Sequence, residues 1–217
     1  GYAQTKWVAE RMVRTAAERG LPVTIHRINT GGHSVTGAFN RLDHLSLILK
    51  GCVEAGIAPH TLALMPVQPA PIDYVAAAVV ALADRPEALG GTFHLVNERA
   101  MTWRELFDAV EEFGYPLRRL PLDDWREQVT GRNAGTMALL GLAPFLRDTM
   151  DHARLPFSES SITKAALEGT GVCCPPLTTE LVHTFLRGFV EAGFVPPPRT
   201  ASARPAPSSS ASVSSAS

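Results

Sequence analysis

Few cysteines and no long apolar run set the first limits on this chain of 217 residues. Its three cysteines are Cys52, Cys173 and Cys174. An odd and small number of cysteines does not make a disulfide framework, so we expect a reducing compartment, the cytoplasm. The longest apolar run, residues 75–83, is far shorter than the roughly 18 residues that cross a membrane. The sequence therefore predicts neither a disulfide-rich secreted domain nor a membrane protein.

The chain also lacks a strong charge of either sign and any metal-ligand spacing. Its 20 Lys and Arg residues balance 21 Asp and Glu residues, which leaves a net charge of −1. The basic residues are scattered, which argues against the positive surface that nucleic-acid-binding proteins present. The seven histidines form no H-x-x-x-H pair and no cluster with cysteine, so we expect no metal site. A G-x-S-x-G turn is absent as well, which argues against a hydrolase.

The first half of the chain contains alternating helical and strand patterns. Residues 2–19 have apolar positions at helical spacing and end before Gly20, and residues 23–28 are mostly β-branched. Further helices are predicted over 43–55, 72–83 and 102–113, and further strands over 62–65 and 92–96. A helix, a short turn and a strand in this order predict a parallel α/β fold.

The second half follows a different pattern. A short strand over 117–120 precedes helices predicted over 123–129, 137–146, 163–167 and 178–192. We therefore divide the chain into an α/β portion (1–114), a mostly helical portion (115–198) and a tail (199–217). The tail is rich in Ser, Ala and Pro and buries too little apolar surface to fold, so we expect it to be disordered.

Tyr2 and Lys6 are the first candidates for chemistry. Four residues apart on a helix, two side chains lie on one face about a turn from each other. An ammonium beside a phenol lowers the phenol's pKa from its reference of about 10, so the tyrosine can exchange protons near neutral pH. The alternative is an ordinary surface pair. Lysine occurs elsewhere only at Lys50 and Lys164, and a strand and a glycine-rich loop follow, which favours the catalytic interpretation.

The glycine-rich segment 29–40 follows a predicted strand, at the edge where open α/β sheets bind their ligands. His33 and Ser34 either line a substrate entrance or hold the loop through hydrogen bonds, and the sequence does not decide between the two. Asp73 and Tyr74 begin a strongly apolar helix. We interpret Asp73 as a helix cap and Tyr74 as a packing residue rather than as a catalytic pair.

In this order the motifs resemble the thioester reductase domains that end many nonribosomal peptide synthetases and some polyketide synthases. These domains belong to the extended short-chain dehydrogenase/reductase family and are similar to the terminal domains of carboxylic acid reductases. The matching segments are collinear up to about Pro198, and they are residues 1–10, 20–23, 32–37, 72–75, 92–97, 113–116, 169–176 and 192–197. The resemblance implies the C-terminal part of a Rossmann-like α/β fold with a mostly helical substrate subdomain.

The resemblance also implies a role for each matching residue. Tyr2 is expected to protonate the substrate carbonyl oxygen, and Lys6 to bind the nicotinamide ribose and hold down the phenol's pKa. The backbone at Ile28 is expected to pass the nicotinamide, so Tyr2, Lys6 and Ile28 are the expected cofactor contacts. The family commonly has proline and then glycine where this chain has Ile28 and Asn29, which changes the shape beside the ring. The expected substrate-side residues are Asn29, His33 and Ser34.

The implied reaction is the NADPH-dependent release of an acyl or peptidyl thioester from the phosphopantetheine arm of a carrier protein, as an aldehyde or alcohol. Upstream synthetase modules are the further expected partners. The sequence lacks the family's glycine-rich phosphate-binding turn and its oxyanion Ser or Thr, so we expect a fragment that is inactive alone. The alternatives are another extended reductase or epimerase acting on an acyl-CoA or sugar nucleotide, and a catalytically incompetent piece.

Overall fold

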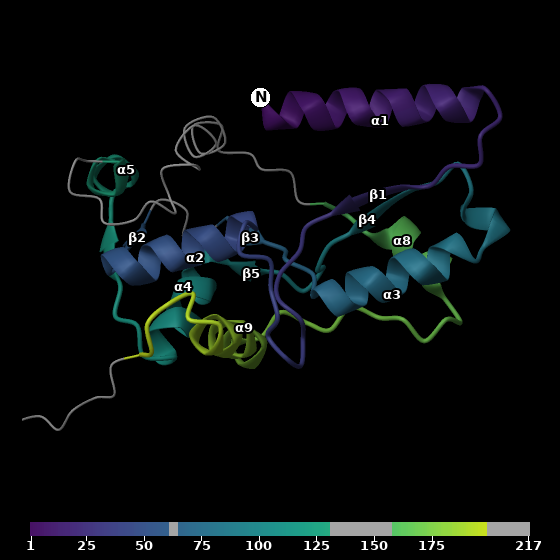
Figure 1. The fold of residues 1–217 in the computed structure, drawn as a ribbon. Coiled ribbons are helices and arrows are strands. Elements are labelled where there is room, and N and C mark those ends of the chain that lie inside the picture. Colours follow the sequence, from purple (N-terminus) through teal and green to yellow (C-terminus); the bar gives the residue numbers. More distant parts are fainter. Residues whose placement is uncertain (61–64, 131–157, 199–217) are drawn as a thin grey trace, which may run out of the picture.

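The computed structural model describes residues 1–60, 65–130 and 158–198. Figure 1 shows two packed parts side by side, one built on β1 and β4 and the other on α2, α4 and α9. The elements in chain order are α1 (Tyr2–Glu18), β1 (Ile25–Ile28), α2 (His44–Ala55), β2 (Ile57–Pro59), β3 (Pro66–Val67), α3 (Ile72–Ala83), η1 (Pro86–Ala88), β4 (Thr92–Leu95), β5 (Met101–Thr102), α4 (Trp103–Glu112), β6 (Arg118–Leu120), α5 (Leu122–Thr130), α8 (Ser161–Leu167) and α9 (Thr179–Glu191).

Within the described residues the strands pair two by two, and two of the three pairs are parallel. β1 lies parallel to β4, with Ile25 opposite Thr92 and Ile28 opposite Leu95. β2 lies parallel to β6, and β3 is antiparallel to β5. Parallel strands need long crossover connections, which the intervening helices supply here. The predicted α/β class is confirmed.

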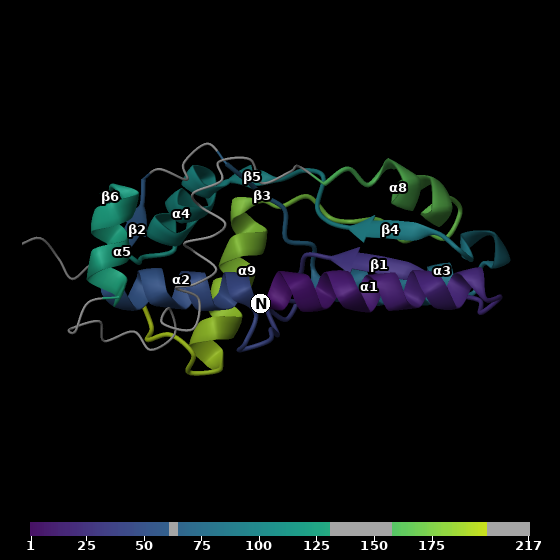
Figure 2. The ribbon, with the colours of Figure 1, turned by 90° about the horizontal axis from the view of Figure 1, so that it is seen from above.

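Helices cover both faces of the β1–β4 pair. α1 lies over one face and α3 over the other, while α8 lies beyond the β4 edge (Figures 1 and 2). α3 is more apolar than α1, α2, α4, α5 and α9, and it packs against β4 in the smaller of two hydrophobic clusters. The buried members of that cluster are Ala70, Tyr74, Val75, Ala78, Leu82, Ala88, Phe93, Leu95 and Leu167. Among the described residues no helix is both long and apolar enough to cross a membrane.

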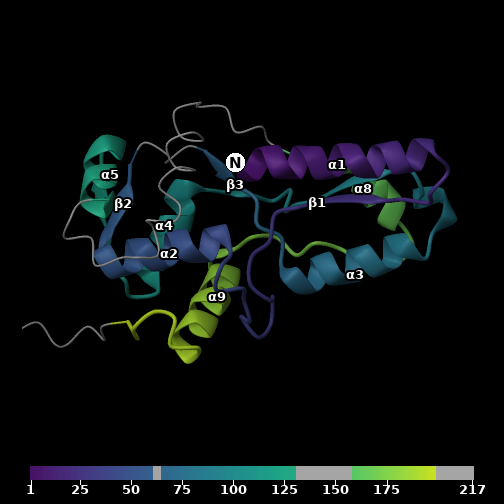
Figure 3. The same cartoon turned by 45° about the horizontal axis from the view of Figure 1, so that its top comes forward.

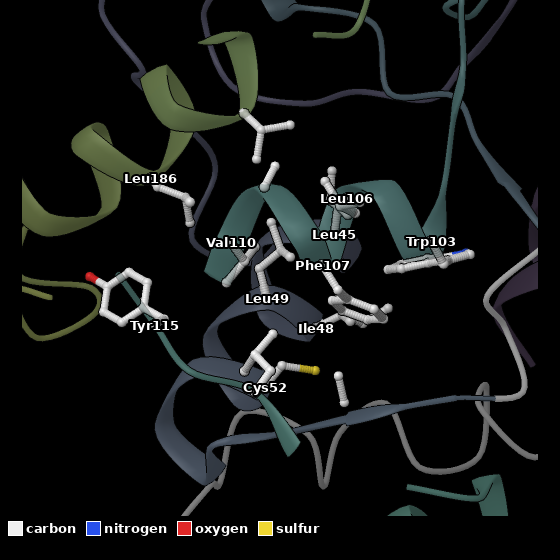
Figure 4. Packing of buried hydrophobic residues seen from close by; sticks show 14 of the residues in the cluster. Leu45, Ile48, Leu49, Cys52, Trp103, Leu106, Phe107, Val110, Tyr115 and Leu186 are labelled. Carbon is white, nitrogen blue, oxygen red and sulfur yellow. The ribbon is translucent and has the colours of Figure 1, made fainter. Parts of the chain in front are cut away.

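The larger hydrophobic cluster lies between α2, α4 and α9. Figure 4 shows Leu45, Ile48, Leu49 and Cys52 of α2 facing Trp103, Leu106, Phe107 and Val110 of α4. α9 closes the cluster with Phe185, Leu186 and Phe189, and α5 adds the fully buried Trp125. The described residues of the predicted helical portion, 115–130 and 158–198, thus contribute to this cluster and, through α8, to the smaller one. Its division from residues 1–114 stays a prediction.

Capping residues set the helix ends largely where the sequence predicts them. Asp43 accepts hydrogen bonds from two backbone N–H groups at the start of α2, and Gly56 ends that helix with a φ of 65°. Thr102 and Glu105 form a reciprocal capping box at the start of α4. The helices predicted to begin at these caps are therefore confirmed.

Some expectations are wrong and others fall on residues that the structure does not describe. Asp73 does not cap α3, because the cap position is Pro71 and no side chain fills it. The packing role of Tyr74 is confirmed by its burial. β2, β3 and β5 escaped prediction because their two or three residues show no alternation, whereas the equally short β6 lies within the strand predicted over 117–120. Residues 62–64 of an expected strand, the helix expected over 137–146 and the tail 199–217 lie outside the described residues.

Candidate active site

A pocket of about 350 Å³ opens at the carboxyl ends of β1 and β4. Ile28 and Asn29 line it from the β1 side, and His94 and Val96 from the β4 side. Its other walls are Arg27, Asp43, His44, Leu45, Pro66, Val67, Gln68, Trp103 and Ser158. Because open α/β sheets bind ligands at the carboxyl ends of their strands, this pocket is the candidate active site.

A second hollow, of about 450 Å³, lies between α1 and β1. Lys6, Glu10 and Val13 line it from the helix, and Ile28 lines both this hollow and the pocket at the strand ends. Tyr2 is the first helical residue of α1, one turn before Lys6. Since β1 runs back toward the N-terminal end of α1 (Figure 1), the predicted dyad lies on the helix that borders the end of β1.

Charged hydrogen bonds fasten α1 to β1. Glu10 of α1 accepts from Arg27 of β1, with Nη2 at 2.7 Å and Nε at 3.0 Å, and from Arg14 of its own helix at 2.9 Å. Arg14 also donates to Thr92 of β4, and Arg27 Nη1 lies 3.2 Å from His94 Nε2. The bonds from Arg27 and Arg14 lower the pKa of Glu10 to about 2. This network sets the position of α1, and of its first turn, relative to the strand end.

We expect Glu10→Gln to weaken the attachment of α1 in a pH-dependent way. The Glu10 carboxyl has an ordinary pKa of 4.5 and a pKa of about 2 in the folded protein, so the folded state binds fewer protons. Its contribution to stability is therefore fully present above the ordinary pKa and is lost as pH falls toward 2. The difference in free energy of unfolding between wild type and Glu10→Gln should be largest near neutral pH and shrink steadily below about pH 5.

Urea titrations at several pH values measure this difference. Glu18→Gln is the matched control, because Glu18 is an exposed glutamate of the same helix. The Glu18→Gln difference should stay small throughout the pH range. An equal effect of Glu10→Gln at acidic and neutral pH would contradict the role assigned to the Glu10 carboxylate.

The loop after β1 is fastened to the segment that leads into α3. Backbone hydrogen bonds join residues 29–32 to residues 70–72. Ser34 donates twice to Asp73, from its N–H to Oδ1 at 2.9 Å and from its hydroxyl to Oδ2 at 2.5 Å. His33 Nδ1 accepts from the N–H groups of the two residues that follow Ser34. The structure therefore shows that His33 and Ser34 hold the loop through hydrogen bonds. Their role on the substrate side stays a prediction.

The structure brings together only some of the predicted site residues. Lys6 and Ile28 share the hollow under α1, and Ile28 and Asn29 share the pocket at the strand ends. His33 and Ser34 line neither space and lie instead against the first turn of α3. Among the described residues, no group of three or more His, Cys, Asp or Glu side chains is placed to hold a metal ion.

Gln68 is a pocket residue that the sequence did not reveal. It is buried, its Oε1 accepts from Ser158 N at 3.1 Å, and its Nε2 donates to Ser158 O at 3.2 Å and to Asn97 O. This pairing holds Ser158 in the pocket wall although the two residues are 90 positions apart. A single glutamine between prolines carries no spacing signal, so only the folded chain identifies it.

A parallel strand pair flanked by helices, with a helix that begins with a Tyr-x-x-x-Lys sequence beside it, is part of a Rossmann-like α/β fold of the kind found in extended short-chain dehydrogenases and reductases. The NAD-binding family described as male sterility protein matches residues 1–79. The crystal structure of the terminal R domain from the myxalamid PKS-NRPS biosynthetic pathway is 40% identical, with a TM-score of 0.79, and the match covers 91% of this chain and 51% of that one.

Two curated relatives are a synthase and a reductase. The isonitrile lipopeptide synthase of Streptomyces coeruleorubidus is 34% identical over an alignment of 220 positions, which covers 95% of this chain and 14% of that protein. The large subunit of L-2-aminoadipate reductase from Penicillium chrysogenum is 31% identical over an alignment of 225 positions, which covers 95% of this chain and 16% of that protein. The chain is similar over most of its length to terminal reductase domains of nonribosomal peptide and polyketide synthetases, so the resemblance is confirmed. It spans about half of such a domain and a small part of the curated relatives.

Proposed function

We propose that this chain carries the proton-donating dyad of a reductase that releases a carrier-bound acyl or peptidyl thioester as an aldehyde or alcohol. The observation that carries the proposal is the 40% identity, at a TM-score of 0.79, with a terminal reductase domain of a polyketide and peptide pathway. The NAD-binding family that matches residues 1–79 supports a nicotinamide cofactor, and NADPH is our choice between the two nucleotides.

The hollow between α1 and β1 fits one end of such a cofactor. Ile28 is 55% exposed at the end of β1, which leaves an apolar surface open for a flat ring. Lys6 lines the same hollow, where its ammonium would hold the ribose hydroxyls. When bound, NADPH supplies the hydride for the reduction.

The chain's own residues supply the proton chemistry. Tyr2 donates its hydroxyl proton to the oxygen of the thioester carbonyl, and Lys6 favours the phenolate that remains because it is positively charged. With a hydride on carbon and a proton on oxygen the thioester becomes a hemithioacetal. Its C–S bond then breaks, which gives the aldehyde and the free thiol of the phosphopantetheine arm. A second reduction of the aldehyde gives the alcohol.

The carrier protein and the upstream synthetase modules are the partners that we propose. The two curated relatives support this, since the matched region is only 14% and 16% of their lengths.

The compartment that we propose is the cytoplasm. All three cysteines, Cys52, Cys173 and Cys174, are free thiols, which supports a reducing compartment.

We further propose that the exposed apolar surface formed by α1 and the turn after it packs against the nucleotide-binding half of the complete domain. Trp7, Met12 and Leu21 are 66%, 69% and 59% exposed, and they line a surface hollow of about 430 Å³. Exposed apolar patches of this kind mark surfaces that another unit covers. The 217-residue chain by itself is therefore expected neither to bind NADPH tightly nor to turn over.

Reduction by the complete protein tests the proposal. We expect NADPH oxidation and aldehyde or alcohol formation with an acyl chain loaded on the carrier protein, slower reaction with the matching free acyl-CoA, and none with a sugar nucleotide. Replacing NADPH with NADH tests the choice of nucleotide. Assays of the 217-residue chain alone test whether NADPH binding and turnover require the nucleotide-binding half of the domain. Reaction only with a free acyl-CoA or with a sugar nucleotide would establish the alternative reductase or epimerase instead.

A further inference from the structure

The loop of residues 29–37 crosses from the end of β1 toward α2 and passes beside α9 (Figure 3). Its first residues continue the strand. The Asn29 N–H donates to Leu95 O of β4, its carbonyl accepts from Ala70 N, and Gly31 N donates to Ala70 O. These backbone hydrogen bonds fix the start of the loop. They also hold Asn29 in the pocket wall.

Farther along, one side chain holds the loop. Both oxygens of the Asp73 carboxylate accept from Ser34, one from the backbone N–H and one from the hydroxyl. Burial by itself raises the pKa of Asp73, but the hydrogen bonds from Ser34 outweigh this effect and the pKa lies below its ordinary value. Hydrogen bonds to an ionised group are stronger than neutral ones, so this pairing stays formed at neutral pH.

α9 supports the same loop from the other side. A Cβ added to Gly31 or Gly32 would come within 2.8 Å or 2.7 Å of the Phe185 ring. Gly37, with a φ of +67°, lies against the backbone of α9 at Gly188. The loop is therefore fixed between Asp73 on α3 and the glycine and aromatic surface of α9.

Two alternative roles for Asp73 do not match its contacts. It does not cap α3, whose cap position is Pro71. It also does not form a Ser–His–Asp relay, because the Ser34 hydroxyl donates to Asp73 itself and the closest approach of His33 Nδ1 to Asp73 Oδ1 is 3.9 Å. The role that its contacts do support is to hold the loop after Ile28, through the two hydrogen bonds that Asp73 accepts from Ser34.

We propose that Asp73 is a positioning residue of the reductase, which holds Ser34 and so fixes the loop that continues from Asn29, the residue of this loop that lies in the pocket wall. The inference rests on the proposed function, because it assigns this wall to the carrier-bound thioester. The Asp73 side chain is 31% exposed, so its loss changes overall stability little and acts mainly on local order. Loosening the loop misplaces the thioester rather than the nucleotide, because Lys6 and the end of β1 do not depend on the Ser34 contact.

The test uses the complete protein with a carrier-bound thioester and NADPH. Asp73→Asn and Ser34→Ala should each lower kcat by about 10-fold or more and raise the KM for the thioester, with the KM for NADPH nearly unchanged. Ser34→Thr keeps the hydroxyl and should restore most of the rate. Asp84→Asn is the matched control, since Asp84 is an exposed aspartate at the far end of the same helix, and it should behave as wild type.

Hydrogen exchange of the complete protein provides a readout without turnover. In Asp73→Asn the amides of residues 34–37 should exchange about 10-fold faster than in wild type, and those of α3 and α9 should not change. Unchanged exchange, or faster exchange with unchanged kinetics, overturns the positioning role while the proposed function stands. A wild-type protein that reduces no carrier-bound thioester overturns the proposed function and this inference with it.

Discussion

Tyr2→Phe in the complete reductase is expected to lower kcat for thioester reduction by about 10²- to 10⁴-fold and to leave NADPH binding nearly unchanged. The substitution removes only the hydroxyl. Phenylalanine keeps an aromatic residue type at the first position of α1, and Lys6 remains one turn later in the helix. Without the hydroxyl the carbonyl oxygen has no positioned proton donor, so the loss falls on the chemical step.

Stopped-flow NADPH oxidation and a separate NADPH titration measure the two quantities. Tyr115→Phe is the matched control, because the Tyr115 hydroxyl donates to Pro196 O at 2.6 Å, in the larger core and outside the pocket. It should lower stability by about 1 kcal/mol and leave kcat as it is. If Tyr2→Phe retains most of its activity, or if it loses NADPH binding to the same degree, Tyr2 is not the proton donor.

Gly37→Ala is expected to destabilise the chain by about 3 kcal/mol or more, because two costs add. Gly37 has a φ of +67°, which L-residues adopt only with strain. In addition, the new methyl group would collide with the carbonyl oxygen of Thr184 and with the backbone of Gly188 on α9. The rigid backbone of a buried helix cannot give way as a flexible side chain would.

Gly90→Ala separates the two costs. Gly90 has a similar φ of +79°, but a Cβ there meets nothing within 4 Å. Its substitution should therefore show the conformational strain alone, about 1 kcal/mol. Denaturant titrations of both variants give the comparison. Equal losses in the two variants would mean that the contact between the loop and α9 is not as close as the structure shows.

The sequence predicts most of the helices because their ends carry chemical signals. Asp43 and Gly56 bound α2, and Thr102 with Glu105 begins α4. The strand pair β1–β4 is also predicted, since both strands contain β-branched or aromatic residues between turn signals. β2, β3 and β5 are too short to show a period, and they form because pairing partners from distant segments meet them.

Part of the candidate site could likewise be predicted from local sequence, and part could not. The spacing of Tyr2 and Lys6 and the position of Ile28 follow from local sequence, so their neighbourhood could be predicted, while their roles remain to be tested. Gln68 holding Ser158, and Asp73 holding Ser34, depend on segments 90 and 39 residues apart. No local pattern encodes such pairs, because the tertiary fold alone decides which side chains meet.

The alternation of β1 makes this short strand intolerant of insertions and deletions. His26 stacks on Phe93 of the smaller core on one face, and Arg27, the next residue, reaches Glu10 of α1 on the other. A shift of one residue would exchange these faces. A guanidinium would then enter the apolar core and an imidazole would face Glu10, so the helix with Tyr2 and Lys6 would lose its anchor. Homologous chains are therefore expected to keep the length of this strand and, on each face, a residue that suits its neighbours.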